Sequence, residues 1–253
     1  MTKLPLPVRG GGILEIHGSP EARKIIVIVG RDASHQDETV IARIIAYFEE
    51  RGITVACYES WDAETFRLIT PPWIAAYPRL IRRATKILLL LANPARWPYL
   101  RKKSRLERST IAYRAEALLE AIRFLKTERE VFLLTRSAGG RIASLVADAA
   151  GANKLACLGY PFENPKEGVN PARFAHLPEV HTPFLILQGT RDPYGGREID
   201  GKYTLSPQTS LEWVDTDHEF QLSDQEWNRV LPRLEGFFFP ENKTAKTQRK
   251  AGV

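Results

Sequence analysis

The sequence predicts an α/β fold in which helices cover both faces of a mostly parallel sheet. Short apolar runs rich in β-branched residues alternate along the chain with segments of helical periodicity, which is the pattern of strand–helix–strand units. Hydrophobic residues make up 43% of the 253 residues, enough to bury a sizeable core. A chain of this length without an internal repeat favours one domain, which we expect over residues 1–240.

Each expected strand is a short apolar run that ends at a turn or a polar segment. The run KIIVIV over residues 24–29 is apolar throughout, as in a strand buried on both faces, and it ends at Gly30. The same reasoning predicts further strands over residues 12–17, 53–58, 130–134, 154–158, 184–188 and 211–214. Apolar positions that recur every three to four residues predict helices over residues 39–51, 111–127, 140–150 and 223–237.

A basic insert of about residues 61–109 interrupts this alternation and is longer than an ordinary connection. Residues 66–109 contain eleven Lys and Arg against one Glu, a net charge of +10. The whole chain carries only +6, so its positive charge is concentrated in this insert and in the basic tail over 241–253. The tail has no apolar period, and we expect it to be disordered.

Within the insert, the sequence predicts a basic amphipathic helix that ends at Asn93-Pro94. Basic residues recur along one side at helical spacing, namely Arg79, Arg82, Arg83 and Lys86. Aromatic residues stand near both ends of the helix, namely Trp73, Tyr77, Trp97 and Tyr99. Such a helix suits a lid over a pocket, or a surface that rests on an anionic membrane or an acidic partner. It also suits an ordinary surface helix whose leucines pack on the body, and the sequence leaves these interpretations open.

Several classes of protein are excluded or disfavoured. Cys57 and Cys157 are 100 positions apart without a CxxC motif, which argues against a disulfide scaffold and a cysteine zinc site. The histidines show no HExxH spacing, and neither a P-loop nor a GxGxxG motif is present, so we expect no metal and no organic cofactor. The excess positive charge is confined to the insert and the tail, so no specific nucleic-acid partner is expected. Without a signal-peptide pattern or a run of ~18 apolar residues, we expect a cytoplasmic protein.

The stretch VFLLTRSAGGRIAS, residues 131–144, carries the clearest chemical signal. An apolar strand ends at TRSAG and a helix begins at once, which is the layout of a nucleophile elbow with Ser137 on the tight turn. The backbone N–H of Ala138 then points to where an oxyanion would form. Thr135 replaces the first glycine of the usual GxSxG pattern, and Ser137 taken alone also suits a helix N-cap.

Two further strand ends strengthen this interpretation. Asp192 follows the apolar run PFLILQGTR, and His218 follows the run LEWVDTD. The carboxyl ends of parallel strands meet at one edge of the sheet, where ligands bind. Ser137, Asp192 and His218 follow one another along the chain in an order that is known for catalytic triads. In such a triad His218 takes the proton of Ser137, and Asp192 orients and stabilises the imidazole ring.

The segments LLTRSAGGRIAS, YPFENP, HLPEVHTPFLILQGTRDPYG and DTDHEF resemble a branch of small α/β-hydrolases near the dienelactone hydrolases. That branch includes bacterial predicted hydrolases and hydrolase-like domains of chromatin-associated animal proteins. The resemblance covers most of residues 24–237 apart from the insert. It implies an α/β-hydrolase fold with an inserted helical cap segment, and Ser137, Asp192 and His218 as nucleophile, acid and base.

The resemblance also implies a second oxyanion donor in the loop after the strand over residues 24–29. Family members usually carry a sequence similar to His-Gly-Ala-Gly there, whereas this chain has Gly30, Arg31 and Asp32, so the donor is expected to be the Arg31 N–H. The implied reaction is hydrolysis of a small carboxylic ester or related acyl substrate through an acyl-enzyme on Ser137. The alternative is a catalytically silent module of the same fold that binds an acidic partner or a membrane surface through residues 66–109.

Overall fold

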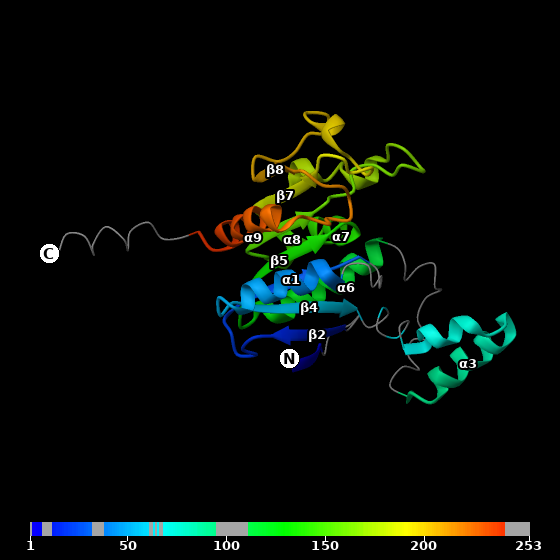
Figure 1. Cartoon of the computed structure of the whole chain (residues 1–253). Coiled ribbons are helices and arrows are strands. Elements are labelled where there is room, and N and C mark those ends of the chain that lie inside the picture. Colours follow the sequence, from blue (N-terminus) through cyan, green and yellow to red (C-terminus); the bar gives the residue numbers. More distant parts are fainter. Residues whose placement is uncertain are drawn as a thin grey trace.

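The computed structural model describes residues 2–6, 12–31, 38–60, 63, 65, 68–94 and 111–240. The basic tail predicted to be disordered lies outside the described residues, as do residues 95–110 of the insert. Figure 1 shows a central sheet with helices packed on both faces and the insert at one side. The mostly parallel α/β architecture predicted from the sequence is thereby confirmed.

The eight strands form one sheet in the order β1-β2-β4-β3-β5-β6-β7-β8. Every pairing from β4 to β8 is parallel, and β1 and β2 add an antiparallel edge. The strands are β1 Thr2–Leu6, β2 Gly12–His17, β3 Lys24–Val29, β4 Thr54–Ser60, β5 Glu130–Arg136, β6 Lys154–Leu158, β7 Phe184–Gly189 and β8 Thr209–Val214. The carboxyl ends of β3 to β8 therefore share one edge of the sheet.

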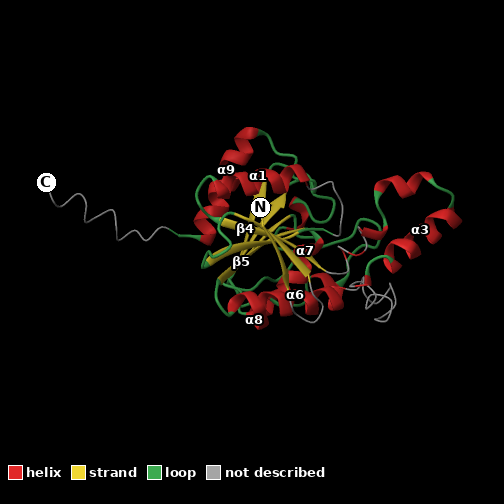
Figure 2. Ribbon diagram, turned by 90° about the horizontal axis from the view of Figure 1, so that it is seen from below, coloured by secondary structure: helices red, strands yellow, loops and turns green. Residues whose placement is uncertain are grey.

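The sheet separates two layers of the core, one beneath the helices on each of its faces. Figure 2 shows these helices on both sides of the strands. The residues of β3 alternate between the two layers: Val27 packs with α6, α7 and α8, whereas Ile26 and Ile28 pack with α1 and α9. This alternation explains why the central strands are apolar on both faces. The α-helices of the body are α1 Glu38–Glu49, α6 Ile111–Lys126, α7 Ala138–Ser144, α8 Ala147–Ala150 and α9 Asp224–Phe238. Short 3₁₀ helices are η4 Pro171–Arg173, η5 Leu177–Glu179 and η6 Arg197–Ile199.

One local prediction is wrong, and one strand was missed. The single helix expected over residues 140–150 is wrong, because Val146 has a φ of −125° and separates α7 from α8. The shorter helix α8 lets the Asp148 carboxylate accept hydrogen bonds from the backbone N–H groups of His181 and Thr182 just before β7. Strand β1 was not expected. Its signal is the alternation in TKLPL, with Pro5 tolerated because the strand lies at the sheet edge.

The insert begins after β4 and forms η2 Pro72–Ala76 and α3 Arg79–Leu91. The predicted amphipathic helix is thus confirmed over Arg79–Leu91. The proline before α3 suits a helix start, and the Asn93 side chain donates to the Leu89 carbonyl at its end. In both views α3 projects away from the body (Figures 1 and 2). Among the described residues, no helix combines the length and apolar character needed to cross a bilayer.

Candidate active site

The turn between β5 and α7 has the backbone of a nucleophile elbow. Ser137 adopts φ 50° and ψ −120°, a conformation that costs a non-glycine residue roughly 1–3 kcal/mol. Two backbone hydrogen bonds hold it there: the Ser137 N–H donates to the Leu158 carbonyl at 3.2 Å, and the Gly140 N–H donates to the Ser137 carbonyl at 2.8 Å. Strain stored at one serine between a buried strand and a helix marks this turn as a candidate site.

The residues around Ser137 are small because the backbone passes close to other strands. A Cβ on Gly139 would lie 2.2 Å from the Val29 carbonyl oxygen, and one on Gly140 would lie 2.4 Å from the sulfur of Cys157. Neither position accepts a side chain without moving its neighbours. The start of α7 therefore lies directly against the end of β3, where the loop with Arg31 begins.

Thr135 occupies the place of the first glycine in the usual elbow pattern. Its side chain is buried, and its Oγ1 donates a hydrogen bond to the Ala156 carbonyl of the neighbouring strand at 2.8 Å. Burial of a hydroxyl is costly when it has no hydrogen-bond partner, and this hydrogen bond removes that cost for Thr135. The substitution is thus accommodated by β6 and leaves the Ser137 turn in place.

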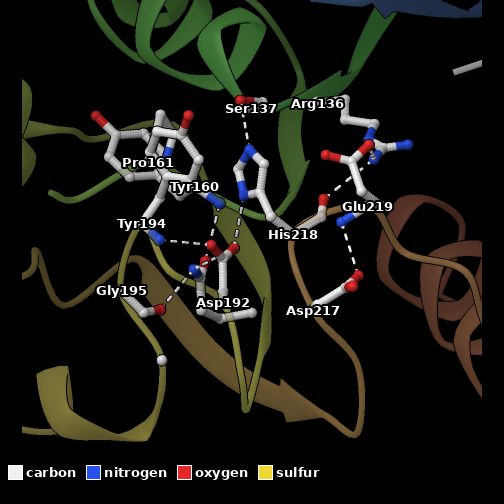
Figure 3. Close-up of polar contacts among 12 residues, drawn as sticks. Arg136, Ser137, Tyr160, Pro161, Asp192, Tyr194, Gly195, Asp217, His218 and Glu219 are labelled. Atoms are coloured by element: carbon white, nitrogen blue, oxygen red, sulfur yellow. Dashed lines mark hydrogen bonds and ion pairs between the residues drawn. The ribbon is translucent and has the colours of Figure 1, made fainter. Parts of the chain in front are cut away.

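The structure brings Ser137, His218 and Asp192 together from three strand ends. Ser137 Oγ lies 2.8 Å from His218 Nε2, and His218 Nδ1 lies 2.7 Å from Asp192 Oδ2. Figure 3 shows the histidine ring between the serine hydroxyl and the carboxylate. All three side chains are buried, where hydrogen bonds are little weakened by water. In the tautomer with the proton on Nδ1, the histidine donates to Asp192 and accepts at Nε2 from the Ser137 hydroxyl, so both hydrogen bonds form.

Asp192 is held by groups other than the histidine. The Tyr194 N–H donates to Asp192 Oδ1 at 2.7 Å, and Gln188 Nε2 donates to Asp192 Oδ2 at 3.0 Å. Gln188 is itself buried, and it also binds the Gly195 carbonyl and the Tyr160 N–H, both at 2.8 Å. Sequence reasoning missed Gln188, whose signal is a polar residue near the end of an otherwise apolar strand.

The histidine ring is enclosed on two sides. The Tyr194 ring packs against it with centroids 4.3 Å apart. On another side lies Gly159, where a Cβ would come within 3.4 Å of His218 Nδ1 and 3.3 Å of Asp192 Oδ2. Gly159 has a φ of +67°, so both its backbone and the closeness of the His–Asp pair favour glycine.

Two arginines anchor the loop that carries His218. Arg136 is only 1% exposed, and its Nη2 donates to the His218 carbonyl at 3.0 Å. Arg31 Nη2 donates to the same carbonyl at 3.1 Å, while Arg31 Nη1 binds both Glu219 carboxylate oxygens at 3.0 and 3.1 Å. Arg136 Nη2 also lies 3.7 Å from the Glu219 carboxylate (Figure 3). Sequence reasoning missed Glu219, which links both arginines beside the histidine.

The predicted oxyanion donors lie on the two segments that meet beside Ser137. Ala138 is half-buried, and its N–H donates to no other residue within the described part of the chain. Arg31 follows the end of β3, against which α7 packs, and its side chain is directed to Glu219 and the His218 carbonyl. Asp32, the next residue of this loop, lies outside the described residues.

Other nucleophiles and metal ligands are not grouped in the described ranges. Burial raises the pKa of both thiols, Cys57 and Cys157, to about 12, so each stays protonated near neutral pH. Across residues 12–31, 38–60 and 111–240, together with the other described positions, no three His, Cys, Asp or Glu side chains are clustered as metal ligands.

A buried serine on a strand-to-helix turn, with His and Asp from later strand ends, defines an α/β hydrolase. The sequence model of the alpha/beta hydrolase domain family matches residues 94–231, and the chain belongs to this family. Among curated protein sequences, none matches this chain. The resemblance noted in the sequence is thereby confirmed.

Solved structures share the fold at low sequence identity. An alpha-beta serine hydrolase homologue from Coxiella burnetii is 16% identical with a TM-score of 0.60, covering 92% of this chain and 96% of its own. A dienelactone hydrolase from Anabaena variabilis is 14% identical with a TM-score of 0.59, covering 94% and 96%. Alpha/beta hydrolase domain-containing protein 10 from mouse is 12% identical with a TM-score of 0.58, covering 94% and 98%. At these identities the likeness concerns the fold.

Proposed function

We propose that this chain is a serine hydrolase that cleaves a small carboxylic ester or a related acyl compound through an acyl-enzyme on Ser137. The observation that carries the proposal is the unbroken chain of hydrogen bonds from Ser137 through His218 to Asp192, at 2.8 and 2.7 Å. It starts at a strained, buried elbow, where a serine hydroxyl and a general base are held at hydrogen-bonding distance.

In the acylation step, Ser137 Oγ attacks the carbonyl carbon of the ester while its proton passes to His218 Nε2. Asp192, bound to Nδ1–H, stabilises the imidazolium that forms. When the tetrahedral intermediate collapses, the bond to the alcohol oxygen breaks and His218 returns the proton to that oxygen. The alcohol leaves, and the acyl group stays on Ser137 Oγ as an ester.

In the deacylation step, water takes the place of the alcohol. His218 Nε2 accepts a proton from the water as its oxygen attacks the acyl carbon, and it then protonates Ser137 Oγ as the acyl–enzyme bond breaks. The carboxylic acid is released and the starting state is restored. Ser137 supplies the nucleophile of acylation, and His218 supplies the base of both steps.

Negative charge on the carbonyl oxygen needs donors that are already in place. We assign this role to the backbone N–H groups of Ala138 and Arg31. The Ala138 N–H donates to no other described residue, and this supports the first assignment. The close approach of α7 to the end of β3 at Gly139 supports the second, because Arg31 follows two residues after Val29. The Arg31 side chain is bound to Glu219 and so holds this residue beside the loop that carries His218.

A fluorophosphonate probe tests the proposal, because such probes phosphonylate an activated serine far faster than an ordinary one. We expect labelling of the wild-type protein, loss of labelling in Ser137→Ala and His218→Ala, and retention in Ser144→Ala. Ser144 is a matched control because its Oγ also lies 2.8 Å from a histidine nitrogen, that of His176. A folded wild-type protein that is not labelled would contradict the proposal and favour a silent binding module.

A further inference from the structure

Helix α3 exposes the face that an ordinary surface helix would bury. Leu80 is 81% exposed and Leu88 is 65% exposed, whereas Leu90, on the opposite side, is only 6% exposed. The exposed apolar side chains of this face, called the α3 face below, are Leu80, Ile81, Ile87, Leu88 and Leu91. The buried side of the helix is therefore the one that carries Leu90, and the side chains of the α3 face are exposed instead of packing on the body.

Two exposed aromatic side chains lie on the segment that α3 contacts. Trp73 and Tyr77, on and just after η2, are both exposed, and their rings meet edge to face with centroids 6.2 Å apart. Helix α3 contacts η2, so the aromatic pair and the α3 face belong to one projecting arm (Figure 1). Trp and Tyr rings with one apolar side and one polar atom are the side chains that favour the boundary between lipid and water.

The charge of the arm is entirely positive. Residues 65–106 contain no Asp or Glu. Arg79 and Arg83 are exposed and Arg82 is half-exposed, and no acidic side chain in the described ranges pairs with any of the three. Long arginine side chains can extend alongside an apolar face and place their guanidinium groups in a polar layer above it. A partner for this arm must supply both anionic groups and an apolar layer.

We propose that the α3 face docks on an anionic lipid bilayer, with the helix lying in the interface. Lipid phosphates match the uncompensated arginines, and the acyl boundary beneath them matches the exposed leucines and isoleucines. An acidic protein surface would match the charge and leave the apolar face in water. The proposal rests on the insert alone and is independent of the hydrolase activity.

Docking would also set the orientation of the body. In Figure 1 the arm lies on the side toward which the β4 arrow points, which is the side of the carboxyl ends of the parallel strands. Ser137 follows the carboxyl end of β5, which is parallel to β3 and hence to β4. An arm bound in the interface thus places the bilayer on the same side of the body as the sheet edge with Ser137.

Vesicle flotation tests the proposal with the full-length protein. Vesicles of phosphatidylcholine alone are compared with vesicles that also contain phosphatidylserine. We expect wild-type protein and Ser137→Ala to float with the anionic vesicles. Leu80→Ser/Leu88→Ser should bind at least tenfold more weakly, because large exposed apolar side chains are lost. Arg79→Gln/Arg83→Gln should lose about fivefold per arginine, and only on anionic vesicles.

The control variant is Val169→Ser, which removes an apolar side chain 55% exposed on the body. It should float as the wild-type protein does. Melting temperatures equal to that of the wild type would show that the variants fold. Equal flotation of the wild type and both arm variants would overturn the proposal, as would no flotation on either vesicle. Light scattering that shows a dimer broken by Leu80→Ser/Leu88→Ser would overturn it in favour of a second copy.

Discussion

Among the described residues, two serine–histidine pairs have the same distance between the hydroxyl oxygen and the ring nitrogen. Ser137 Oγ and His218 Nε2 lie 2.8 Å apart, and so do Ser144 Oγ and His176 Nε2. Both serines belong to the same short stretch of chain around α7, and both are buried. The hydrogen bond alone therefore does not distinguish a candidate nucleophile from a structural serine.

The surroundings of the two pairs differ. Ser137 stands on a turn with positive φ, whereas Ser144 is the last residue of α7 and its hydroxyl also lies within 3.2 Å of the Arg141 carbonyl. Behind His218 lies the Asp192 carboxylate. No carboxylate in the described residues hydrogen-bonds to His176, and burial together with the nearby Arg141 lowers the pKa of that imidazole.

This comparison teaches what a nucleophile needs beyond a nearby base. A proton moves to the histidine only if the imidazolium is stabilised, and the attacked carbonyl needs a donor for its oxygen. The Ser137 pair has Asp192 and the Ala138 N–H, which no described residue accepts from, whereas His176 lies beside a cation that opposes its protonation. We therefore assign reactivity to one pair and a packing role to the other.

The largest expected difference is between the two alanine variants. Ser137→Ala should lower ester hydrolysis on the order of 10⁴-fold or more, because the covalent route is removed. Ser144→Ala should keep kcat/KM within about threefold and lose about 1 kcal/mol of stability with its hydrogen bond. Initial rates with p-nitrophenyl esters and thermal melts measure both. Comparable rate losses in the two variants would break the distinction.

The carboxylate behind the histidine gives the next largest effect. Asp192→Asn should lower kcat by about 10³- to 10⁴-fold, because the amide favours the wrong imidazole tautomer and leaves the imidazolium unstabilised. Steady-state kinetics of this variant measure the loss. The control is Asp148→Asn, which removes a carboxylate that binds the segment before β7. A wild-type kcat in Asp192→Asn would show that Asp192 does not support His218.

A smaller effect is expected from the carboxylate that links the two arginines. Glu219→Gln removes the charge shared by Arg31 and Arg136, both of which also hold the His218 carbonyl. We expect kcat to fall about tenfold with KM nearly unchanged, since misplacement of a catalytic group lowers turnover. The control is Asp215→Asn, an exposed partner of Arg191 at the surface. A fall in melting temperature with unchanged kcat would assign Glu219 a structural role alone.

The smallest effect concerns the second pair and the pH dependence of stability. Because the pKa of His176 is lowered in the folded protein, the unfolded chain binds a proton there more readily. The contribution of neutral His176 is therefore complete above the unfolded pKa of about 6.5 and is lost as pH falls below it. The melting temperature of the wild-type protein should fall more between about pH 7.5 and pH 5.5 than that of His176→Gln. Equal falls in melting temperature for the wild type and His176→Gln would contradict a lowered pKa of His176.

The main features of the fold followed from local patterns. Continuous apolar runs predicted the central strands, and the step from TRSAG into a helix predicted where Ser137 would stand. Those features depend on residues that are neighbours along the chain, so they can be predicted from the sequence alone. The break between α7 and α8 depends on Asp148 meeting the segment before β7, and no pattern near Val146 indicates it.

Other features of the site depend on contacts between distant segments. Glu219 was missed because its role exists only once Arg31 and Arg136 approach it from two other strand ends. The insert shows a different limit. Periodicity identified the apolar side of α3, but it cannot tell whether that side faces the body or the solvent.

One measurement tests the central claim most directly. The protein is mixed with an acylating p-nitrophenyl ester, quenched in acid within a turnover and digested with trypsin. Arg136 and Arg141 are cleavage sites, so Ser137 falls in the peptide of residues 137–141 and Ser144 in that of residues 142–154. Mass spectrometry should find the acyl group on the first peptide and not on the second. An acyl group on the second peptide, or on neither while ester is hydrolysed, would contradict the assignment of Ser137 as the nucleophile.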